Sequence, residues 1–210
     1  MDEHDVQDSL TGVIQTLLNK RKDTLTNWVK PIARLFNRVN PNTVTILALI
    51  FCVAAGLYFA SGKVIQAGIM LLVGGFFDVL DGGVARENGR VTKFGGMLDS
   101  VSDRYADAAV FLGIMWGGHT AIPKYIENDW ILGAVALVGS LLVSYSRARA
   151  EAAGTGELKI GVAERAERML LIIFGAFLGL LNWAVLIVAI LSHLTVIHRM
   201  VASWKILKEQ

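Results

Sequence analysis

Long apolar runs alternate with short polar connections over most of the chain, and each run is about as long as a membrane-crossing helix. A helix needs ~20 apolar residues to cross ~30 Å of hydrocarbon. The predicted spans are 44–60, 64–85, 94–116, 130–150, 168–181 and 183–204, of which the fifth is short. The pattern therefore predicts an all-α integral membrane protein with six transmembrane helices.

The sequence before the first span has a different pattern. Between residues 10 and 38, apolar positions recur every three or four residues among lysines and arginines, which is typical of an amphipathic helix lying in the membrane interface. A helix packed across the end of the bundle would give the same pattern. We expect a cytosolic N-terminal segment over 1–43 with this interfacial helix, and a six-helix membrane domain over 44–210. The acidic, polar start predicts no cleavable signal peptide.

Composition supports the membrane setting and excludes some alternatives. The chain is 54% hydrophobic and 18% charged, whereas soluble domains carry about 25% charged residues. Its net charge of +2 is too small to argue for nucleic acid. With the single cysteine Cys52, no internal disulfide can form.

The basic residues indicate how the spans are oriented. They gather before the first span, in the second-to-third and fourth-to-fifth connections, and after the sixth span, while the other side has only Lys63 and Lys124. Cytosolic loops carry the excess of Lys and Arg. We therefore predict a multi-pass protein of the cell membrane with both termini and the active site on the cytosolic side.

Four aspartates interrupt the apolar sequence of the second and third spans. Asp78 and Asp81 are three residues apart, and Asp99 and Asp103 are four apart, so each pair shares one helix face. A short connection makes the two helices antiparallel neighbours, so the four carboxylates can converge. Each would cost roughly 2.5–3.5 kcal/mol at the membrane centre, and a divalent cation such as Mg²⁺, which prefers oxygen ligands, would compensate for this.

Three interpretations of these carboxylates are open at this point. They could be solvated charges at helix ends, they could relay protons or ions, or they could hold two metals that clamp the oxygens of a phosphoryl displacement. Four acids on two adjacent helices favour the metal cluster. Asp107 extends the series by another four residues; it could face the site, or it could pair with Arg104 or with another span.

The spacing of these residues also resembles a known signature. The matching string is Asp78-x-x-Asp81-Gly82-x-x-Ala85-Arg86, then eight residues, then Gly95-x-x-x-Asp99-x-x-x-Asp103. It resembles the signature of the CDP-alcohol phosphotransferases, membrane enzymes that make phospholipids, and every fixed position is filled. The resemblance implies that an alcohol attacks the β-phosphorus of a CDP-linked lipid and releases CMP. It also implies a divalent metal, as two Mg²⁺ with Mn²⁺ as the alternative, and a homodimer.

The resemblance further implies roles for individual residues. The metal ligands would be Asp78, Asp81, Asp99 and Asp103, and Asp103 would also be the catalytic base. The residues that would bind the nucleotide of the CDP-lipid are Asn42, Thr45, Gly82, Ala85, Arg86 and Gly95.

The acceptor must be inferred from the fourth and fifth spans. Residues 144–151 and 161–168 contain four arginines and three glutamates, and converging arginines suit a phosphate. Flanking charges with local Glu–Arg pairs would also explain them in part. These segments resemble the branch of the family that makes phosphatidylinositol phosphate or its archaeal ether-lipid counterpart, although bacterial members usually have lysine where this chain has Arg147. The residues implied to bind the acceptor phosphate are Arg147, Arg149, Arg165 and Arg199.

The predicted function is therefore transfer of a phosphatidyl-type group, with diacyl or dialkyl glycerol, from a CDP-lipid to inositol 1-phosphate. Within the same family, glycerol 3-phosphate is the alternative acceptor. An ion-coupled membrane transporter is the alternative from a different class. The expected partners are the two substrates, membrane lipid and a second copy of the chain.

Overall fold

The computed structural model describes residues 39–122, 125, 130–158 and 160–208, and they are predominantly helical. The expected interfacial helix over 10–38 lies outside the described residues. The described α-helices are α2 (Pro41–Ala60), α3 (Val64–Glu87), α4 (Lys93–Trp116), α5 (Ile131–Ala150), α6 (Arg165–Leu178) and α7 (Leu181–Lys208), and a π-helical turn, η1 (Glu151–Thr155), continues α5.

Four of these helices are long and apolar enough to cross a membrane: α2, α3, α5 with its η1 extension, and α7. The chain is thus a multi-pass membrane protein. The α4 helix is not among these four, and it carries Lys93, Asp99, Asp103, Arg104 and Asp107. The α6 helix has only 14 residues, about 21 Å at 1.5 Å per residue, which is shorter than the hydrocarbon layer. That α4 and α6 also cross the membrane stays a prediction.

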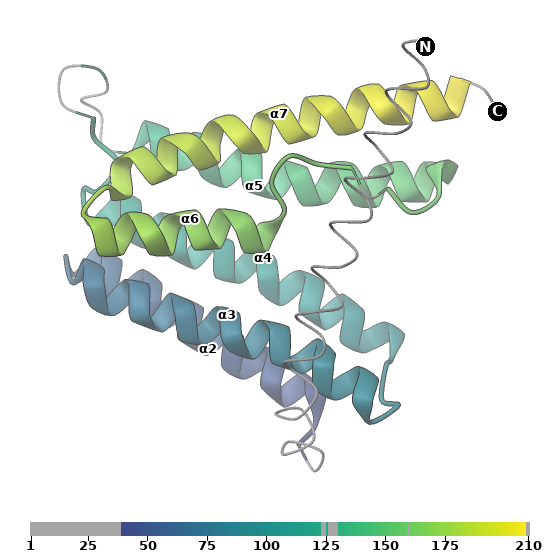
Figure 1. Cartoon of the computed structure of the whole chain (residues 1–210), viewed down its shortest axis with the longest axis horizontal. Coiled ribbons are helices and arrows are strands. Elements are labelled where there is room, and N and C mark those ends of the chain that lie inside the picture. Colours follow the sequence, from purple (N-terminus) through teal and green to yellow (C-terminus); the bar gives the residue numbers. More distant parts are fainter. Residues whose placement is uncertain (1–38, 123–124, 126–129, 159, 209–210) are drawn as a thin grey trace, which may run out of the picture.

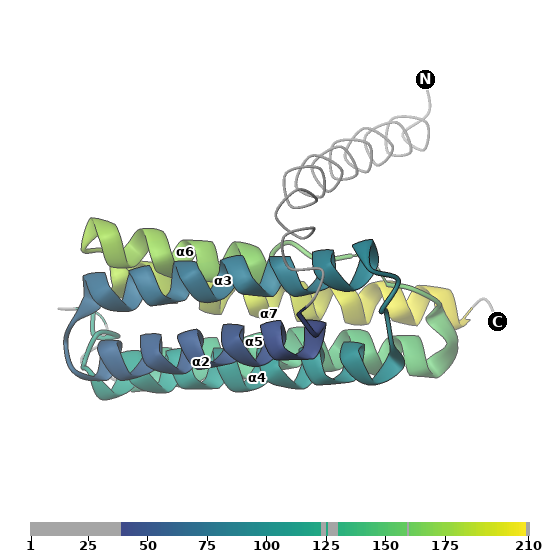
Figure 2. The same ribbon diagram turned by 90° about the horizontal axis from the view of Figure 1, so that it is seen from below.

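The helices form one bundle in which each helix contacts the next around a closed ring, in the order α2, α3, α6, α7, α5, α4. Figures 1 and 2 show the bundle from two sides. The expectation that α3 and α4 are antiparallel neighbours is met only in part. Side chains of Asp78 on α3 and of Asp99 and Asp103 on α4 come together, but within the described residues the two backbones do not pack closely, and α2 packs against both helices. The space between α3 and α4 is therefore available for a site.

The backbones of α2 and α4 approach each other closely, and glycines make this possible. A Cβ atom added at Gly113 would collide with the carbonyl of Gly56, and one added at Gly56 would collide with the carbonyl of Ala109. Small residues permit this approach of two backbones in membrane helices. Next to it lies the main apolar core, which includes Phe59 and Phe111.

Local signals set where the helices start and stop. Asn40 and Thr92 cap α2 and α4, accepting hydrogen bonds from the backbone N–H of Asn42 (3.0 Å) and Gly95 (2.9 Å). At the end of α6, Gly179 adopts a left-handed φ of 70°, a conformation that suits glycine. The predicted boundaries of spans five and six, 168–181 and 183–204, differ from those of α6 and α7. The prediction ran past residue 178 because it did not take Gly179 as the end of the helix.

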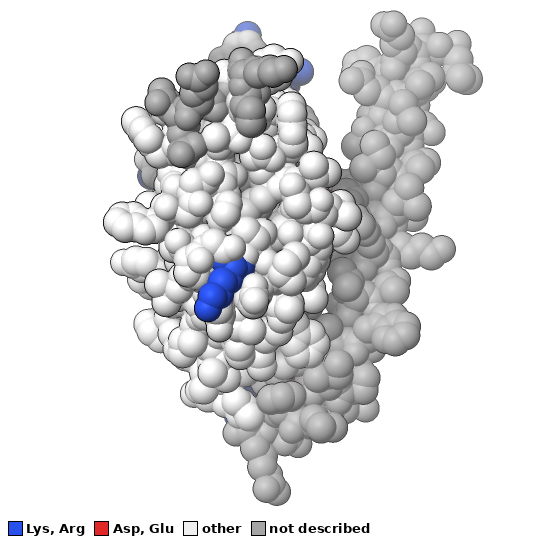
Figure 3. Space-filling view, turned by 90° about the vertical axis from the view of Figure 1, so that its left-hand side faces the viewer, with Lys and Arg blue, Asp and Glu red and all other residues white. Residues whose placement is uncertain are grey.

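The two ends of the bundle differ in charge. Figure 3 shows the end that carries the α2–α3 turn, where few Lys or Arg side chains and no Asp or Glu are visible among the described residues. At the other end α3 finishes and α4 begins, and α5 and α7 finish there too. The basic residues of those helix ends and connections are Arg86, Arg90, Lys93, Arg147, Arg149, Lys205 and Lys208.

Candidate active site

Three of the four motif aspartates meet in the space between α3 and α4. Carboxylate oxygens of Asp78, Asp99 and Asp103 all lie within 4.8 Å of one another, and the three side chains are half-buried. Spacings of three and four residues had predicted that each helix would present its aspartates on one face. Oxygens this close repel one another unless positive charge lies between or beside them.

The fourth motif aspartate, Asp81, has a partner of its own. It is 6% exposed, and its Oδ2 accepts a 2.6 Å hydrogen bond from the hydroxyl of Thr45 on α2. Asp81 is thereby turned toward α2, and the described structure groups it with Thr45 rather than with the other three aspartates. Its predicted role as a metal ligand is not tested by this arrangement and stays a prediction.

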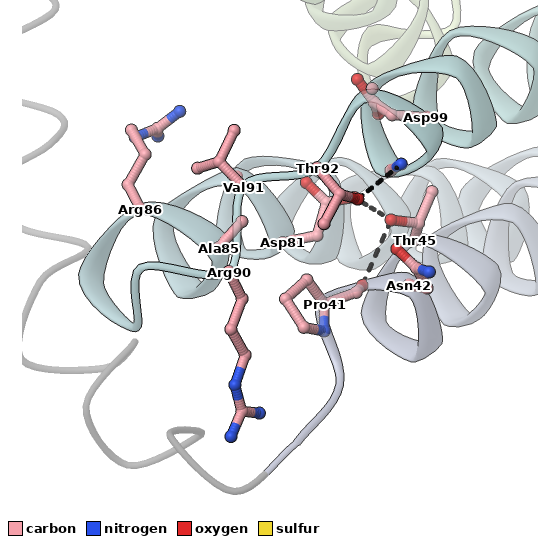
Figure 4. Close-up of a pocket in the computed structure, with 13 residues that line it drawn as sticks. Pro41, Asn42, Thr45, Asp81, Ala85, Arg86, Arg90, Val91, Thr92 and Asp99 are labelled. Atoms are coloured by element: carbon pink, nitrogen blue, oxygen red, sulfur yellow. Dashed lines mark hydrogen bonds between the residues drawn. The ribbon is translucent and has the colours of Figure 1, made fainter.

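A pocket of about 270 Å³ opens beside the aspartates, between the start of α2, the end of α3 and the start of α4. Figure 4 shows Asp81, Thr45 and Asp99 on one side of it, while Arg86 and Arg90 extend in opposite directions. Asp99 belongs both to the pocket wall and to the aspartate group, so the two features are continuous. The residues predicted for nucleotide binding all line this pocket: Asn42, Thr45, Gly82, Ala85, Arg86 and Gly95.

The pocket also contains residues that the sequence analysis missed. The connection between α3 and α4 contributes Arg90, Val91 and Thr92, and further contacts come from Pro41 and Gly96. The connection joins the two halves of the motif, and this position in the sequence was the signal that its residues could line the pocket. Glycine at position 95 keeps the wall open, since a Cβ there would lie 3.0 Å from Thr92 Oγ1 and 3.3 Å from Asn42 Oδ1.

Arg165, the first residue of α6, reaches into the aspartate group. Its Nη1 lies 2.9 Å from Oδ1 of Asp78 and 2.8 Å from Oδ1 of Asp103, and its Nε donates to Oδ1 of Asp107 at 3.0 Å. Figure 1 shows α6 beginning part-way along the bundle rather than at its end. A residue predicted for the acceptor phosphate is therefore in direct contact with the predicted catalytic base.

Asp107 lies behind the site and pairs with another helix, as one of the sequence interpretations predicted. It is 3% exposed. Besides Arg165, its second oxygen faces Nη2 of Arg168 at 3.6 Å. Arg168 is itself 1% exposed and donates from Nη1 to the carbonyl of Ala163 at 3.1 Å. Arg104, the other predicted partner, instead lies 3.7 Å from Asp103.

The remaining predicted acceptor arginines are arranged differently from one another. Arg147 donates from Nε to Glu151 at 2.9 Å and is 3.8 Å from Glu157. Arg149 is exposed at the end of α5. Arg199 is buried, with Nε donating to the carbonyl of Ile160 at 2.6 Å and Nη1 donating to the carbonyl of Val143.

Arg199 thus holds the connection between α5 and α6, and Thr195 helps it. The hydroxyl oxygen of Thr195 accepts hydrogen bonds from the backbone N–H groups of Val162 (3.2 Å) and Ala163 (3.3 Å). These contacts fix the segment that leads into Arg165. Sequence reasoning missed this role, since only the backbone carbonyls of distant residues reveal it.

Chemically, the site combines carboxylates, a guanidinium and a pocket. Carboxylate oxygens are ligands for hard divalent cations, and a guanidinium matches phosphate oxygens. A site that holds a cation next to a phosphate-sized anion can stabilise charge that shifts between phosphate groups. Phosphoryl-group chemistry at the α3–α4 gap accounts for all three components.

Solved structures share this fold. Phosphatidylinositol phosphate synthase of Mycobacterium tuberculosis with CDP-DAG bound is 34% identical in sequence, with a TM-score of 0.72, and the match covers 84% of this chain and 93% of that one. The same enzyme in complex with manganese and citrate gives a TM-score of 0.73 at 34% identity, covering 84% and 88%.

Sequence comparison agrees with the structural likeness. An archaetidylinositol phosphate synthase of Pyrococcus horikoshii is 41% identical over 186 residues, which is 89% of this chain and 94% of that protein. The CDP-alcohol phosphatidyltransferase family matches residues 38–197, a range that holds the motif aspartates, the pocket and the predicted acceptor arginines except Arg199. This chain belongs to the CDP-alcohol phosphatidyltransferase family.

Proposed function

We propose that this enzyme transfers a phosphatidyl-type group from a CDP-lipid to inositol 1-phosphate and releases CMP. One observation carries the proposal: the pocket lined by the motif residues is continuous, through Asp99, with the carboxylate group that Arg165 enters. A nucleotide in the pocket would have its phosphates beside the aspartates. Arg165 would be the cation nearest to the phosphate of the acceptor.

The carboxylates fit a divalent metal. Asp78, Asp99 and Asp103 offer oxygen ligands close together, which suit Mg²⁺ or Mn²⁺, and the mycobacterial enzyme is described in complex with manganese. We propose two Mg²⁺, with Asp81 as the fourth ligand. The bound metal would neutralise the pyrophosphate and the departing CMP.

Asp103 is the proposed base. In the reaction, the acceptor hydroxyl oxygen forms a bond to the β-phosphorus, the bond from that phosphorus to the CMP oxygen breaks, and the hydroxyl proton passes to the Asp103 carboxylate. The contact of Asp103 with Arg165 fits this role, because Arg165 would hold the acceptor near the carboxylate that deprotonates it.

Arginines are the proposed basis for choosing a phosphorylated acceptor. Arg165 would bind the phosphate of inositol 1-phosphate, with Arg147 and Arg149 at the end of α5 beside it, while Arg199 would act through the connection that it holds. The names of the archaeal and mycobacterial relatives, both inositol phosphate lipid synthases, support this acceptor. Lipids with diacyl or dialkyl glycerol are both proposed donors.

The proposed setting is the cell membrane, with both termini and the active site at the cytosolic side. The basic residues at the pocket end of the bundle, and the few that are visible at the opposite end (Figure 3), support this orientation. We also propose six spans within a membrane domain over 44–210, an interfacial segment over 1–43, and a homodimer.

An acceptor screen tests the proposal. Purified enzyme in detergent would receive CDP-diacylglycerol or CDP-archaeol with Mg²⁺, and CMP release would be measured with inositol 1-phosphate, glycerol 3-phosphate, inositol and serine. We expect release with inositol 1-phosphate, and none after chelation of the metal. Release of CMP with glycerol 3-phosphate instead would reject inositol 1-phosphate as the acceptor, but the proposal that the acceptor carries a phosphate would still hold.

A further inference from the structure

We propose that Asp107 is a positioning residue that fixes the guanidinium of Arg165 for the acceptor phosphate. This inference rests on the proposed function, in which Arg165 binds that phosphate. Asp107 lies outside the aspartate signature and outside the residues predicted from the sequence for metal, nucleotide or acceptor. It acts through Arg165 rather than on a substrate.

The first argument is the way the guanidinium is held. Its Nε donates to Asp107 at 3.0 Å, and its Nη1 lies 2.9 Å from Asp78 and 2.8 Å from Asp103. The guanidinium is planar and rigid. Contacts at two of its nitrogens, to carboxylates on different helices, therefore determine both its position and its orientation.

The second argument is that Asp107 is itself held in place. Its side chain is only 4% exposed, and each carboxylate oxygen faces a different arginine: Oδ1 faces Arg165 and Oδ2 faces Arg168. Arg168 is anchored in turn by the carbonyl of Ala163. A carboxylate that is fixed in this way provides a defined position at which the guanidinium of Arg165 binds.

The third argument concerns Asp78 and Asp103, which are also proposed metal ligands. If a cation shared these carboxylates, their hold on Arg165 would be weakened, because their negative charge would be divided between two positive partners. Asp107 is not one of the three grouped aspartates, and its described ion pairs are with Arg165 and Arg168. It is the partner that would keep Arg165 at the site, and a pre-organised guanidinium loses less freedom when a phosphate binds.

A double-mutant cycle tests the inference. The variants are Asp107→Asn, which keeps the shape but removes the charge, Arg165→Lys, which replaces the separate Nε and Nη1 donors with a single nitrogen, and the combination of the two. We expect Asp107→Asn to raise the KM for the phosphorylated acceptor roughly tenfold, since charged hydrogen bonds are about twice as strong as neutral ones. The KM for CDP-lipid should stay within about twofold of the wild type. In the Arg165→Lys background, Asp107→Asn should add little.

The midpoint of thermal unfolding, measured without substrate, gives a second reading of the same cycle. Non-additive shifts for Asp107→Asn and Arg165→Lys would support the contact, and additive shifts would overturn the inference whatever the acceptor is. Equal rises in acceptor KM from Asp107→Asn in both backgrounds would also overturn it, because Asp107 would then act through Arg168 and the fold.

Asp107→Glu covers the case in which Asp107→Asn does not fold. It keeps a negative charge beside the buried Arg168 and moves the carboxylate by one methylene group. We expect a folded enzyme with a raised acceptor KM, and a wild-type acceptor KM would overturn the inference. Failure of the wild type to use any phosphorylated acceptor would reject the proposed function separately, and the unfolding cycle would still decide whether Asp107 holds Arg165.

Discussion

Nη1 of Arg165 lies 2.8 Å from Oδ1 of Asp103, so a cation from the start of α6 touches the last aspartate of the motif on α4. The pair joins two parts of the chain to which the sequence assigned different tasks, acceptor binding and proton removal. It makes the predicted acceptor residue Arg165 and the motif aspartates Asp78 and Asp103 parts of one contact network.

Replacing Arg165 with alanine should weaken acceptor use. The change removes a charge-assisted contact worth roughly 1.5–3 kcal/mol, which is about ten- to a hundredfold in affinity. We expect the KM for inositol 1-phosphate to rise by that factor while the KM for CDP-lipid changes little, as measured by CMP release at varied concentrations of each substrate.

Arg104→Gln is the matched control, because Arg104 also lies near Asp103, at 3.7 Å, but its side chain is 38% exposed. Only a small change is expected, since exposed ion pairs contribute little. An equal rise in acceptor KM in both variants would show that positive charge alone matters. Weakened CDP-lipid use with unchanged acceptor dependence in Arg165→Ala would contradict the acceptor assignment.

Asp78→Asn and Asp99→Asn should each abolish transfer, because each removes a negative ligand oxygen from the carboxylate group. Loss of a residue that only supports a metal ligand typically lowers metal affinity or activity roughly 10–100-fold. Loss of a ligand itself should therefore lower activity by about 100-fold or more. Mn²⁺ binding measured by electron paramagnetic resonance should weaken in parallel. Near-normal CMP release at ordinary metal concentration would remove the residue from the metal site.

Asp103→Asn should reduce turnover more than CDP-lipid binding, if its main task is to take the hydroxyl proton. The amide keeps the shape of the side chain beside Arg165 but cannot accept the proton. Binding of CDP-lipid by calorimetry and CMP release would be compared in the same preparation. An equal loss in both would make Asp103 chiefly a metal ligand.

Thr45→Val should weaken the pocket through Asp81. The buried carboxylate would lose its 2.6 Å hydrogen bond, and an unsatisfied buried group costs about 1–3 kcal/mol. We expect a lower midpoint of thermal unfolding and a higher KM for CDP-lipid, while Thr45→Ser, which keeps the hydroxyl, stays close to the wild type. A wild-type KM for CDP-lipid in Thr45→Val would separate this hydrogen bond from donor binding.

The hydrophobic pattern was sufficient to place most helices, because membrane helices need long apolar runs and the connections here are short. It predicted 64–85 and 94–116 where α3 and α4 run from Val64 to Glu87 and from Lys93 to Trp116. The pattern carried no information on which helices pack together. In the structure α2 packs against both α3 and α4, and Gly56 and Gly113 allow its backbone to approach that of α4 closely.

At the site, the sequence predicted the meeting of Asp78 with Asp99 and Asp103, but it did not predict the contacts that α6 and α7 make. Periodicity put Asp99 and Asp103 on one face, and the resemblance predicted the pocket residues that the structure brings together. The contact of Arg165 with Asp103 depends on α6 starting part-way along the bundle, and the burial of Arg199 depends on the carbonyls of Val143 and Ile160. Both are tertiary contacts without a local sequence signal.

The most direct measurement is a mass balance of the reaction in proteoliposomes. The purified enzyme would be given CDP-lipid, Mg²⁺ and inositol 1-phosphate, and the extracted lipids and the released nucleotide would be quantified by mass spectrometry. The account predicts one CMP for each new lipid that carries inositol phosphate. Recovery of intact CDP-lipid, or CMP release with phosphatidic acid as the only lipid product, would contradict it.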